Sequence, residues 1–153
     1  MAETNAGLLL LSALLLGIFL GAQLAEACLF VPIWRRMKPD EFFEQHKTVG
    51  PMIYRFFAPL TVLATVIPLV TVALYWFSGS DSSGMLAGMG LASAAFFSTY
   101  FVYFKSANKK FATRAIADSE LPDELSRWNR WHWVRIIFEG IAFVCCLGLL
   151  LAE

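Results

Sequence analysis

The protein has 153 residues, of which 58% are hydrophobic and only 16% are charged, and its mean hydropathy is +0.62. Its 12 basic and 12 acidic residues leave no net charge. This composition is more apolar than that of soluble domains, so it indicates an integral membrane protein with one domain, residues 1–153. The sequence has no glycine-rich phosphate fingerprint and no stretch long enough for a soluble catalytic domain, and we expect no nucleic-acid partner.

Four segments are apolar over the roughly 20 residues that a helix needs to cross a bilayer. They are residues 6–34, 51–77, 85–104 and 128–152. The first is interpreted as a spanning helix and not as a signal peptide, because no Lys or Arg precedes it and it continues to Trp34. We therefore expect an all-α fold, an integral membrane antiparallel four-helix bundle with both termini on one side.

The basic residues are distributed unevenly along the chain. All 12 lie in or beside two connections, at residues 35–55 and 105–135, and the opposite helix ends carry none. By the positive-inside rule both connections are cytoplasmic, and the termini and the 78–84 loop are not. The expected location is a bacterial inner membrane, and the bilayer itself is the first expected partner.

Two further patterns describe how the helices begin and pack. Pro-plus-acid sequences at 38–41 and 121–124 predict helix starts, the first ending at Gly50-Pro51 and the second standing above the membrane. Small residues recur every four positions and allow close helix approach, within the bundle or between two copies of the chain. These ridges are Ala13, Gly17, Gly21 and Ala25 on the first helix and Gly84, Gly88 and Ala92 on the third.

Polar side chains within the predicted spans gather at the helix ends nearest the basic connections. They are Gln23 and Glu26, then Tyr54 and Arg55, then Ser98, Tyr100 and Tyr103, and finally His132, Arg135 and Glu139. Because the chain reverses direction at each crossing, these four ends meet at one level. The sequence therefore predicts one polar pocket in the cytoplasmic half of the membrane.

The fourth helix carries the most informative part of this pocket. His132, Arg135 and Glu139 share one helix face, and ionisable groups inside a bilayer mark functional sites by default. At about 1.5 Å per residue, Glu26 and Glu139 are expected at similar depth, where Arg55 and Arg135 would balance them. One hypothesis is that His132 or a carboxylate moves a proton on a lipophilic substrate while an arginine holds the anion. The alternative is a structural network in which Arg135–Glu139 and Arg55–Glu26 pairs lock the bundle.

A metal site is not expected, because the candidate ligands do not occur at ligand spacing. Those candidates are His46, His132, Glu26 and Glu139. A haem between His46 and His132 is the one cofactor alternative, and otherwise we expect none.

The stretch 127–135, preceded by Asn108 and a basic patch, resembles the anthrone-oxygenase-like family of small four-helix membrane proteins. The end of the first helix, residues 30–34, is similar to that family's opening. The resemblance implies a cofactor-independent oxygenation, in which an acidified C–H group of an anthrone is deprotonated and the carbanion reduces O₂. Four residues occupy the motif positions, namely Asn108, Trp128, His132 and Arg135.

The sequence is therefore interpreted as an oxygenase or proton-abstracting enzyme acting on a lipophilic, anthrone-like compound. The candidate catalytic residues are His132, Glu26, Arg135 and Glu139, and the candidate substrate-binding residues are Arg55, Tyr54, Tyr100, Tyr103, Asn108 and Trp128. A non-enzymatic membrane subunit or hydrophobic small-molecule binder is the first alternative. A haem or quinone redox subunit is the second.

The charge distribution makes a testable prediction about sidedness. Alkaline phosphatase, which is active only outside the cytoplasm, should be active when fused at the C-terminus and inactive when fused after residue 114. A fluorescent protein that folds only in the cytoplasm should give the reverse pattern. The positive-inside assignment is wrong if the two reporters exchange places.

Overall fold

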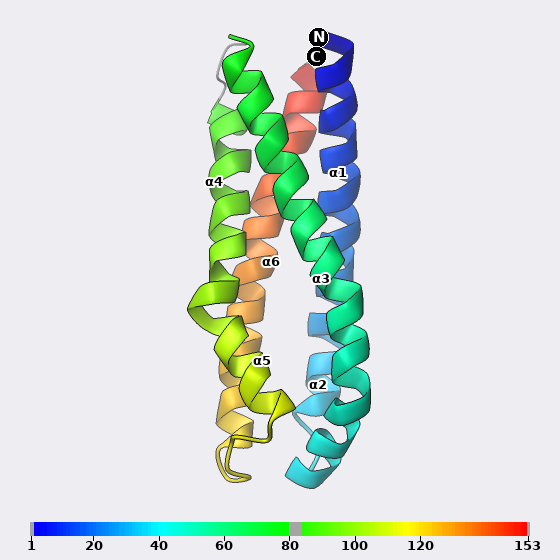
Figure 1. Ribbon diagram of the computed structural model, residues 1–153, viewed down its shortest axis with the longest axis vertical. Coiled ribbons are helices and arrows are strands. Elements are labelled where there is room, and N and C mark those ends of the chain that lie inside the picture. The colour runs from blue at the N-terminus through cyan, green and yellow to red at the C-terminus, as the bar shows by residue number, and fades with distance from the viewer. Residues whose placement is uncertain (1, 80–83, 153) are drawn as a thin grey trace.

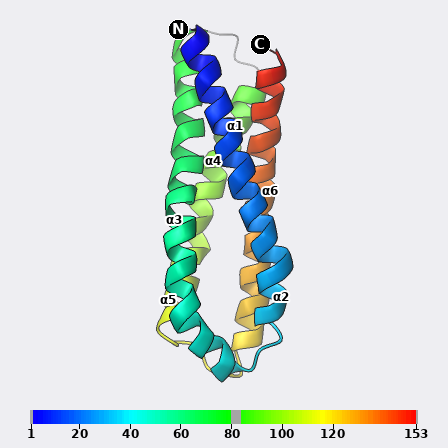
Figure 2. The same ribbon diagram turned by 90° about the vertical axis from the view of Figure 1, so that its right-hand side faces the viewer.

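Within residues 2–79 and 84–152, which the computed structural model describes, the protein forms four helical rods (Figure 1). Each rod is long and apolar enough to cross a membrane, and the rods are residues Ala6–Trp34, Pro39–Phe77, Gly84–Ala112 and Leu121–Ala152. They run antiparallel, and both termini lie at one end (Figures 1 and 2). The predicted all-α membrane bundle is thus confirmed. The other end, with the connections around residues 35–38 and 113–120, is called the basic end.

Two of the rods change their winding near the basic end. In chain order the elements are α1 (Ala2–Ala25), η1 (Glu26–Phe30), α2 (Val31–Trp34), α3 (Pro39–Phe77), α4 (Gly84–Thr99), η2 (Tyr100–Phe104), α5 (Lys105–Ala112) and α6 (Leu121–Ala152). Both η1 and η2 are single turns of π-helix. Such turns are rare and occur frequently at functional sites.

Pro32 gives η1 a local cause. Proline has no N–H group, and its ring crowds the carbonyl four residues earlier, so it weakens the α-helical hydrogen-bond ladder at that point. The chain responds one residue earlier, where the Val31 N–H donates to the carbonyl of Glu26 in the wider π pattern. In η2 the Lys105 N–H donates to the Tyr100 carbonyl in the same way, and no proline of that segment explains it.

The helix α3 begins at Pro39 as predicted, but the predicted break at Gly50-Pro51 is wrong. The helix continues through both residues to Phe77. A proline disfavours a helical residue before it partly through a clash with that residue's Cβ, and Gly50 has none. The start of α3 is therefore continuous with its membrane-spanning part, and the Glu41 carboxylate accepts a hydrogen bond from the Lys38 N–H at 3.2 Å.

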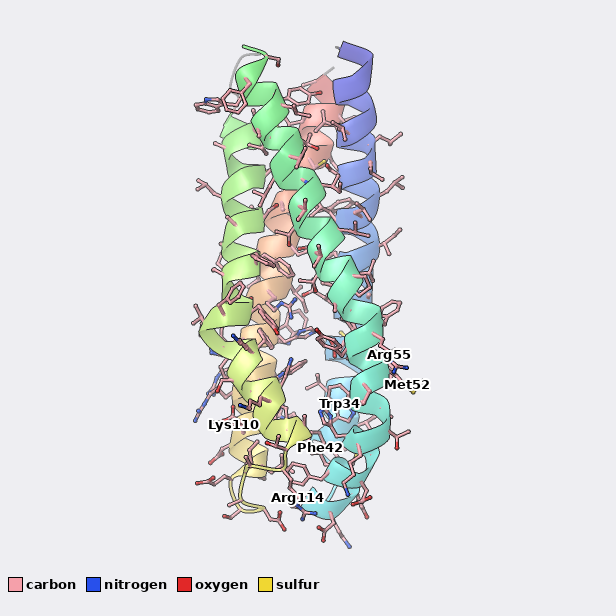
Figure 3. All side chains as sticks on the ribbon, viewed as in Figure 1. Trp34, Phe42, Met52, Arg55, Lys110 and Arg114 are labelled. Atoms are coloured by element: carbon pink, nitrogen blue, oxygen red, sulfur yellow. The ribbon has the colours of Figure 1, made fainter. Side chains whose placement is uncertain are left out.

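The helix α6 starts at Leu121, which confirms the predicted helix start at residues 121–124, and its extension above the membrane stays a prediction. The connection before it is fastened to the start of α3 by Arg114, which has φ 50° and lies at the basic end (Figure 3). Its guanidinium pairs with Asp40 and Asp118 and lies 4.9 Å from the centre of the Phe43 ring. Because Arg114 is exposed, each ion pair contributes little stability, and the contacts mainly define where the connection lies.

The core differs between the two ends of the bundle. At the basic end it is aromatic, and the indoles of Trp34 and Trp128 meet edge to face with centroids 6.1 Å apart. Toward the termini it is aliphatic, but not purely apolar, since the buried hydroxyls of Ser12 and Thr71 are hydrogen-bonded at 3.0 Å. The cavity described below lies at the aromatic end.

Only some residues of the two predicted small-residue ridges lie between helices. A methyl group on Gly17 would lie 3.1 Å from the ring of Phe143 on α6, and one on Gly88 would lie 2.9 Å from the sulfur of Cys145. At Gly21 such a group would meet nothing within 4 Å. Packing within the bundle therefore accounts for Gly17 and Gly88, whereas Gly21 faces outward.

Gly17 and Gly21 make a matched pair for testing this contact. Gly17→Leu should lower the free energy of unfolding by about 1–3 kcal/mol, because the added side chain forces α1 away from α6. Gly21→Leu should leave it unchanged, since its side chain points into open space. The measurement is thermal unfolding in detergent. Equal losses for both variants would contradict the assignment, and a loss of dimer with Gly21→Leu would indicate a seam between copies.

Candidate functional site

A cavity of about 750 Å³ lies inside the basic half of the bundle, between all four rods. Its walls are mostly apolar and include the aromatic residues Trp34, Phe42, Phe57, Phe97, Tyr100 and Phe104. Trp34 and Phe42 point into the space between the helices (Figure 3). The volume suits a drug-sized molecule, and aromatic walls suit a flat, apolar one.

The cavity opens sideways, through the face of the bundle that a bilayer would cover. On α3 its lining includes Tyr54 and Val62, which are 65% and 50% exposed, and on η2 it includes Phe101, which is 60% exposed. Lining residues that are this exposed mark the rim of an opening between α3 and η2. A compound dissolved in the membrane therefore has a direct path to the cavity.

Two opposite charges line the deeper part of the cavity, away from the basic end. Glu26 is the first residue of η1 and is buried, and Arg135 is half-buried on α6. The guanidinium carbon of Arg135 lies 4.7 Å from the ring centres of both Phe96 and Phe104. These cation–π contacts hold the charge in place without using its hydrogen-bond donors, and the Nε of Arg135 is buried with no partner.

His132 lies behind this part of the cavity and does not line it. Its Nε2 is 3.0 Å from the backbone carbonyl of Gln23 and 3.7 Å from a carboxylate oxygen of Glu26. A carbonyl can only accept, so Nε2 carries the proton and donates it to Gln23. The imidazole stacks on Trp128 with centroids 4.9 Å apart, and the Trp128 indole donates to the side-chain oxygen of Asn108 at 3.0 Å.

Glu139 does not reach the cavity. It is fully buried, and neither carboxylate oxygen has a hydrogen-bond partner, so the predicted Arg135–Glu139 pair is not formed. The predicted equal depth of Glu26 and Glu139 is also wrong, because Glu26 approaches His132, which lies about 10 Å nearer the basic end than Glu139. The π turn of η1 holds an additional residue, so Glu26 lies nearer to Trp34 than an α-helical count predicts.

Arg55 does not take part in the cavity either. It is exposed and points away from the bundle beside Met52, so its predicted pairing with Glu26 is wrong (Figure 3). Its neighbour Tyr54 lines the cavity, one helical step of about 100° away. Tyr103 is also outside the lining, because its hydroxyl donates to Glu124 at 2.8 Å and its ring stacks on another aromatic residue of α6.

Six of the predicted site residues do line the cavity, although their functional roles remain predictions. They are Glu26, Tyr54, Tyr100, Asn108, Trp128 and Arg135. Sequence reasoning missed Phe96 and Phe104, which clamp the guanidinium. Their eight-residue spacing, close to two α-helical turns, was the available signal.

The geometry also bears on metal and haem binding. Among the described residues no group of three or more His, Cys, Asp or Glu side chains is arranged to hold a metal ion. His46 lines the cavity and stacks on Phe42, whereas His132 faces the Gln23 carbonyl. The two histidines therefore do not face a common cavity.

Comparison with protein families matches residues 51–145 to the family described as anthrone oxygenase. The match covers more than half of the chain and contains Tyr100, Asn108, Trp128, His132 and Arg135, but not Glu26. It confirms the resemblance seen in the sequence. No curated protein and no solved structure matched the chain.

Tyr103 provides a test of structural against substrate-binding roles. Tyr103→Phe should lower the free energy of unfolding by about 1 kcal/mol, because it removes the donor to one oxygen of the Glu124 carboxylate, while Arg127 still pairs with the other oxygen at 3.3 Å. It should leave the affinity of the cavity for an aromatic probe unchanged. Tyr54→Phe, which alters an exposed hydroxyl at the rim, is the control for stability. A Tyr103→Phe protein with parental stability and weakened probe binding would contradict this assignment.

Proposed function

The chain belongs to the anthrone oxygenase family, and on that premise we propose that it is a membrane-embedded oxygenase acting on a lipophilic, anthrone-like compound. One observation carries the proposal. Glu26 and Arg135, a base and a fixed cation, line the same aromatic cavity inside a membrane bundle. We further propose that it works as a single membrane domain and without a cofactor.

The cavity supports this substrate class by size, lining and access. A fused three-ring ketone is flat and apolar, so it stacks on aromatic walls such as Phe97 and Tyr100. Such a compound concentrates in the bilayer, and the opening between α3 and η2 receives it from there. Its single ketone oxygen is the polar group that Arg135 would hold.

The chemistry begins with removal of a proton. An anthrone has an acidic CH₂ group opposite its ketone, because the resulting anion is a delocalised enolate. Glu26 takes this proton as a general base, and the Arg135 guanidinium stabilises the enolate oxygen. Arg135 is held by two aromatic rings before the substrate arrives, so little reorganisation is needed when the charge develops.

The enolate then reacts with O₂ directly. Electron transfer and recombination form one carbon–oxygen bond, and the peroxide anion takes back a proton to give a hydroperoxide. Loss of water from that hydroperoxide converts the CH₂ carbon into a ketone. Anthrone plus O₂ thus becomes anthraquinone plus water, and the substrate itself supplies every electron.

His132 has a positioning role in this proposal. Its Nε2 proton is engaged by the Gln23 carbonyl, and because His132 does not line the cavity its other nitrogen does not reach a substrate there. Its contact of 3.7 Å with the Glu26 carboxylate helps to hold the base at the cavity wall. We therefore assign the base to Glu26, of the two candidates that the sequence left open.

The test is the aerobic conversion of an anthrone by purified, metal-stripped protein, after subtraction of the spontaneous rate without protein. Glu26→Gln should lower kcat by about 10²-fold or more, because the amide keeps its shape but cannot accept the proton. Arg135→Met should cost about 10²–10³-fold by loss of enolate stabilisation. Arg55→Met is the matched arginine control, since Arg55 is exposed and outside the cavity.

Two outcomes would contradict the proposal. One is a parent protein that does not accelerate the oxidation, and the other is a Glu26→Gln protein as active as the parent. If the parent binds the anthrone in the cavity without turning it over, the protein is a hydrophobic small-molecule binder, the first alternative. His132→Gln should lower kcat less than Glu26→Gln, because its role is to position the base.

A further inference from the structure

A second, smaller pocket lies between α6 and the face of η1 and α2 that is turned away from the large cavity. It has a volume of about 340 Å³, and its lining includes Ala27, Val31, Arg35, Arg36, Asn129 and Trp133. Figure 2 shows α2 beside the first half of α6, where the pocket is formed. It shares no lining residue with the larger cavity, so an inference about it is independent of the proposed function.

The pocket is strongly basic. Two arginines line it and no acidic residue does. The Arg35 guanidinium donates to the hydroxyl of Ser126 on α6 at 3.3 Å, a neutral partner that leaves the charge of the guanidinium uncompensated. The ion pairs among the described residues involve neither Arg35 nor Arg36. Both charges are therefore available to an anion, and a guanidinium matches the geometry of a phosphate group.

Asn129 adds an uncharged hydrogen-bond acceptor that a ligand of this pocket would also satisfy. Its side-chain oxygen is buried with no hydrogen-bond partner within the described part of the chain. A buried acceptor without a donor costs free energy, so a ligand that brings a hydroxyl group to it gains affinity. A phosphate ester whose alcohol carries further hydroxyls satisfies both Asn129 and the arginines.

The position of the pocket identifies where such a ligand comes from. It lies toward the basic end, beside Trp133, and tryptophan is enriched at the membrane–water interface, where the lipid headgroups lie. Beyond Trp133 the same face of α6 continues with Ile137, which is 58% exposed and offers apolar surface to an acyl chain. Phosphate groups of lipids are concentrated at this level of the membrane.

We propose that this pocket binds the phosphate group of an anionic phospholipid whose headgroup carries hydroxyls, such as phosphatidylglycerol. Arg35 and Arg36 hold the phosphate, and Asn129 accepts a hydrogen bond from a headgroup hydroxyl. The acyl chains lie along the outer surface of α1 and α6. A free phosphate ion shares part of this chemistry, and the experiment below separates the two sources.

The experiment is a titration of the full-length protein in uncharged detergent with short-chain phosphatidylglycerol. Bound lipid is counted by native mass spectrometry, and the thermal unfolding temperature is followed in parallel. Arg36→Gln should weaken binding by about fivefold and the double Arg35→Gln, Arg36→Gln variant by about 25-fold. Arg130→Gln is the matched control, because Arg130 is an exposed arginine beside Asn129 that does not line the pocket.

Three further ligands test separately the charge of the lipid, the headgroup hydroxyl, and the lipid against a free phosphate ion. Short-chain phosphatidylcholine should bind at least tenfold more weakly than phosphatidylglycerol, because its headgroup is zwitterionic. Phosphatidic acid, which has no headgroup hydroxyl, should bind equally to the parent and Asn129→Leu proteins, whereas phosphatidylglycerol should bind Asn129→Leu more weakly. Inorganic phosphate that binds the parent as tightly as the lipid would support the phosphate site with the free ion as its ligand.

The proposal is overturned if phosphatidylglycerol and phosphatidylcholine bind the parent equally. It is also overturned if Arg130→Gln weakens binding as much as Arg36→Gln does, because general surface charge would then explain the affinity. Arg36 is exposed, so its substitution is compatible with folding. An Arg36→Gln protein with parental affinity for every ligand would contradict the proposal as well.

Discussion

The structure depends on how two opposite charges are kept inside a bundle that is surrounded by hydrocarbon. Removing a carboxylate and a guanidinium from water costs several kcal/mol for each group unless other contacts compensate. Arg135 is compensated by two aromatic faces, and the charges of Arg135 and Glu26 also attract each other, but no direct hydrogen bond joins the two side chains in the described part of the chain. Both charges therefore remain directed at the cavity, where a ligand can use them.

The winding of η1 places neighbouring residues in different environments. Glu26 lines the large cavity, and Ala27 lines the small basic pocket on the other side of the same helix. This π turn directly precedes Pro32, which removes one hydrogen bond from the α-helical ladder, and the backbone adjusts just before it. One proline in the sequence thus affects the lining of both pockets.

Much of the site was predictable because polar residues are rare in this chain. An intramembrane Glu26, His132 or Arg135 stands out against apolar neighbours, and the reversal of direction at each crossing brings those helix ends together. The predictions that were wrong concern the rotation of residues about a helix axis and their depth along the bundle. Arg55 and Tyr54 are adjacent in sequence, and only one of them lines the cavity, because a helix turns by about 100° per residue. The depth error concerns Glu26, which lies eight residues from Trp34 on a segment with a π turn, whereas Glu139 lies eleven residues from Trp128.

The sequence by itself determined that the protein belongs in a membrane, that four segments are long enough to cross it, and which family it belongs to. These properties depend on composition and on local motifs, which need no knowledge of neighbouring helices. The tertiary structure alone decided which ionisable groups share a cavity. That outcome depends on the rotation, tilt and winding of each helix against the others, and Phe96 and Phe104 select Arg135 as the cation through contacts between α4, η2 and α6.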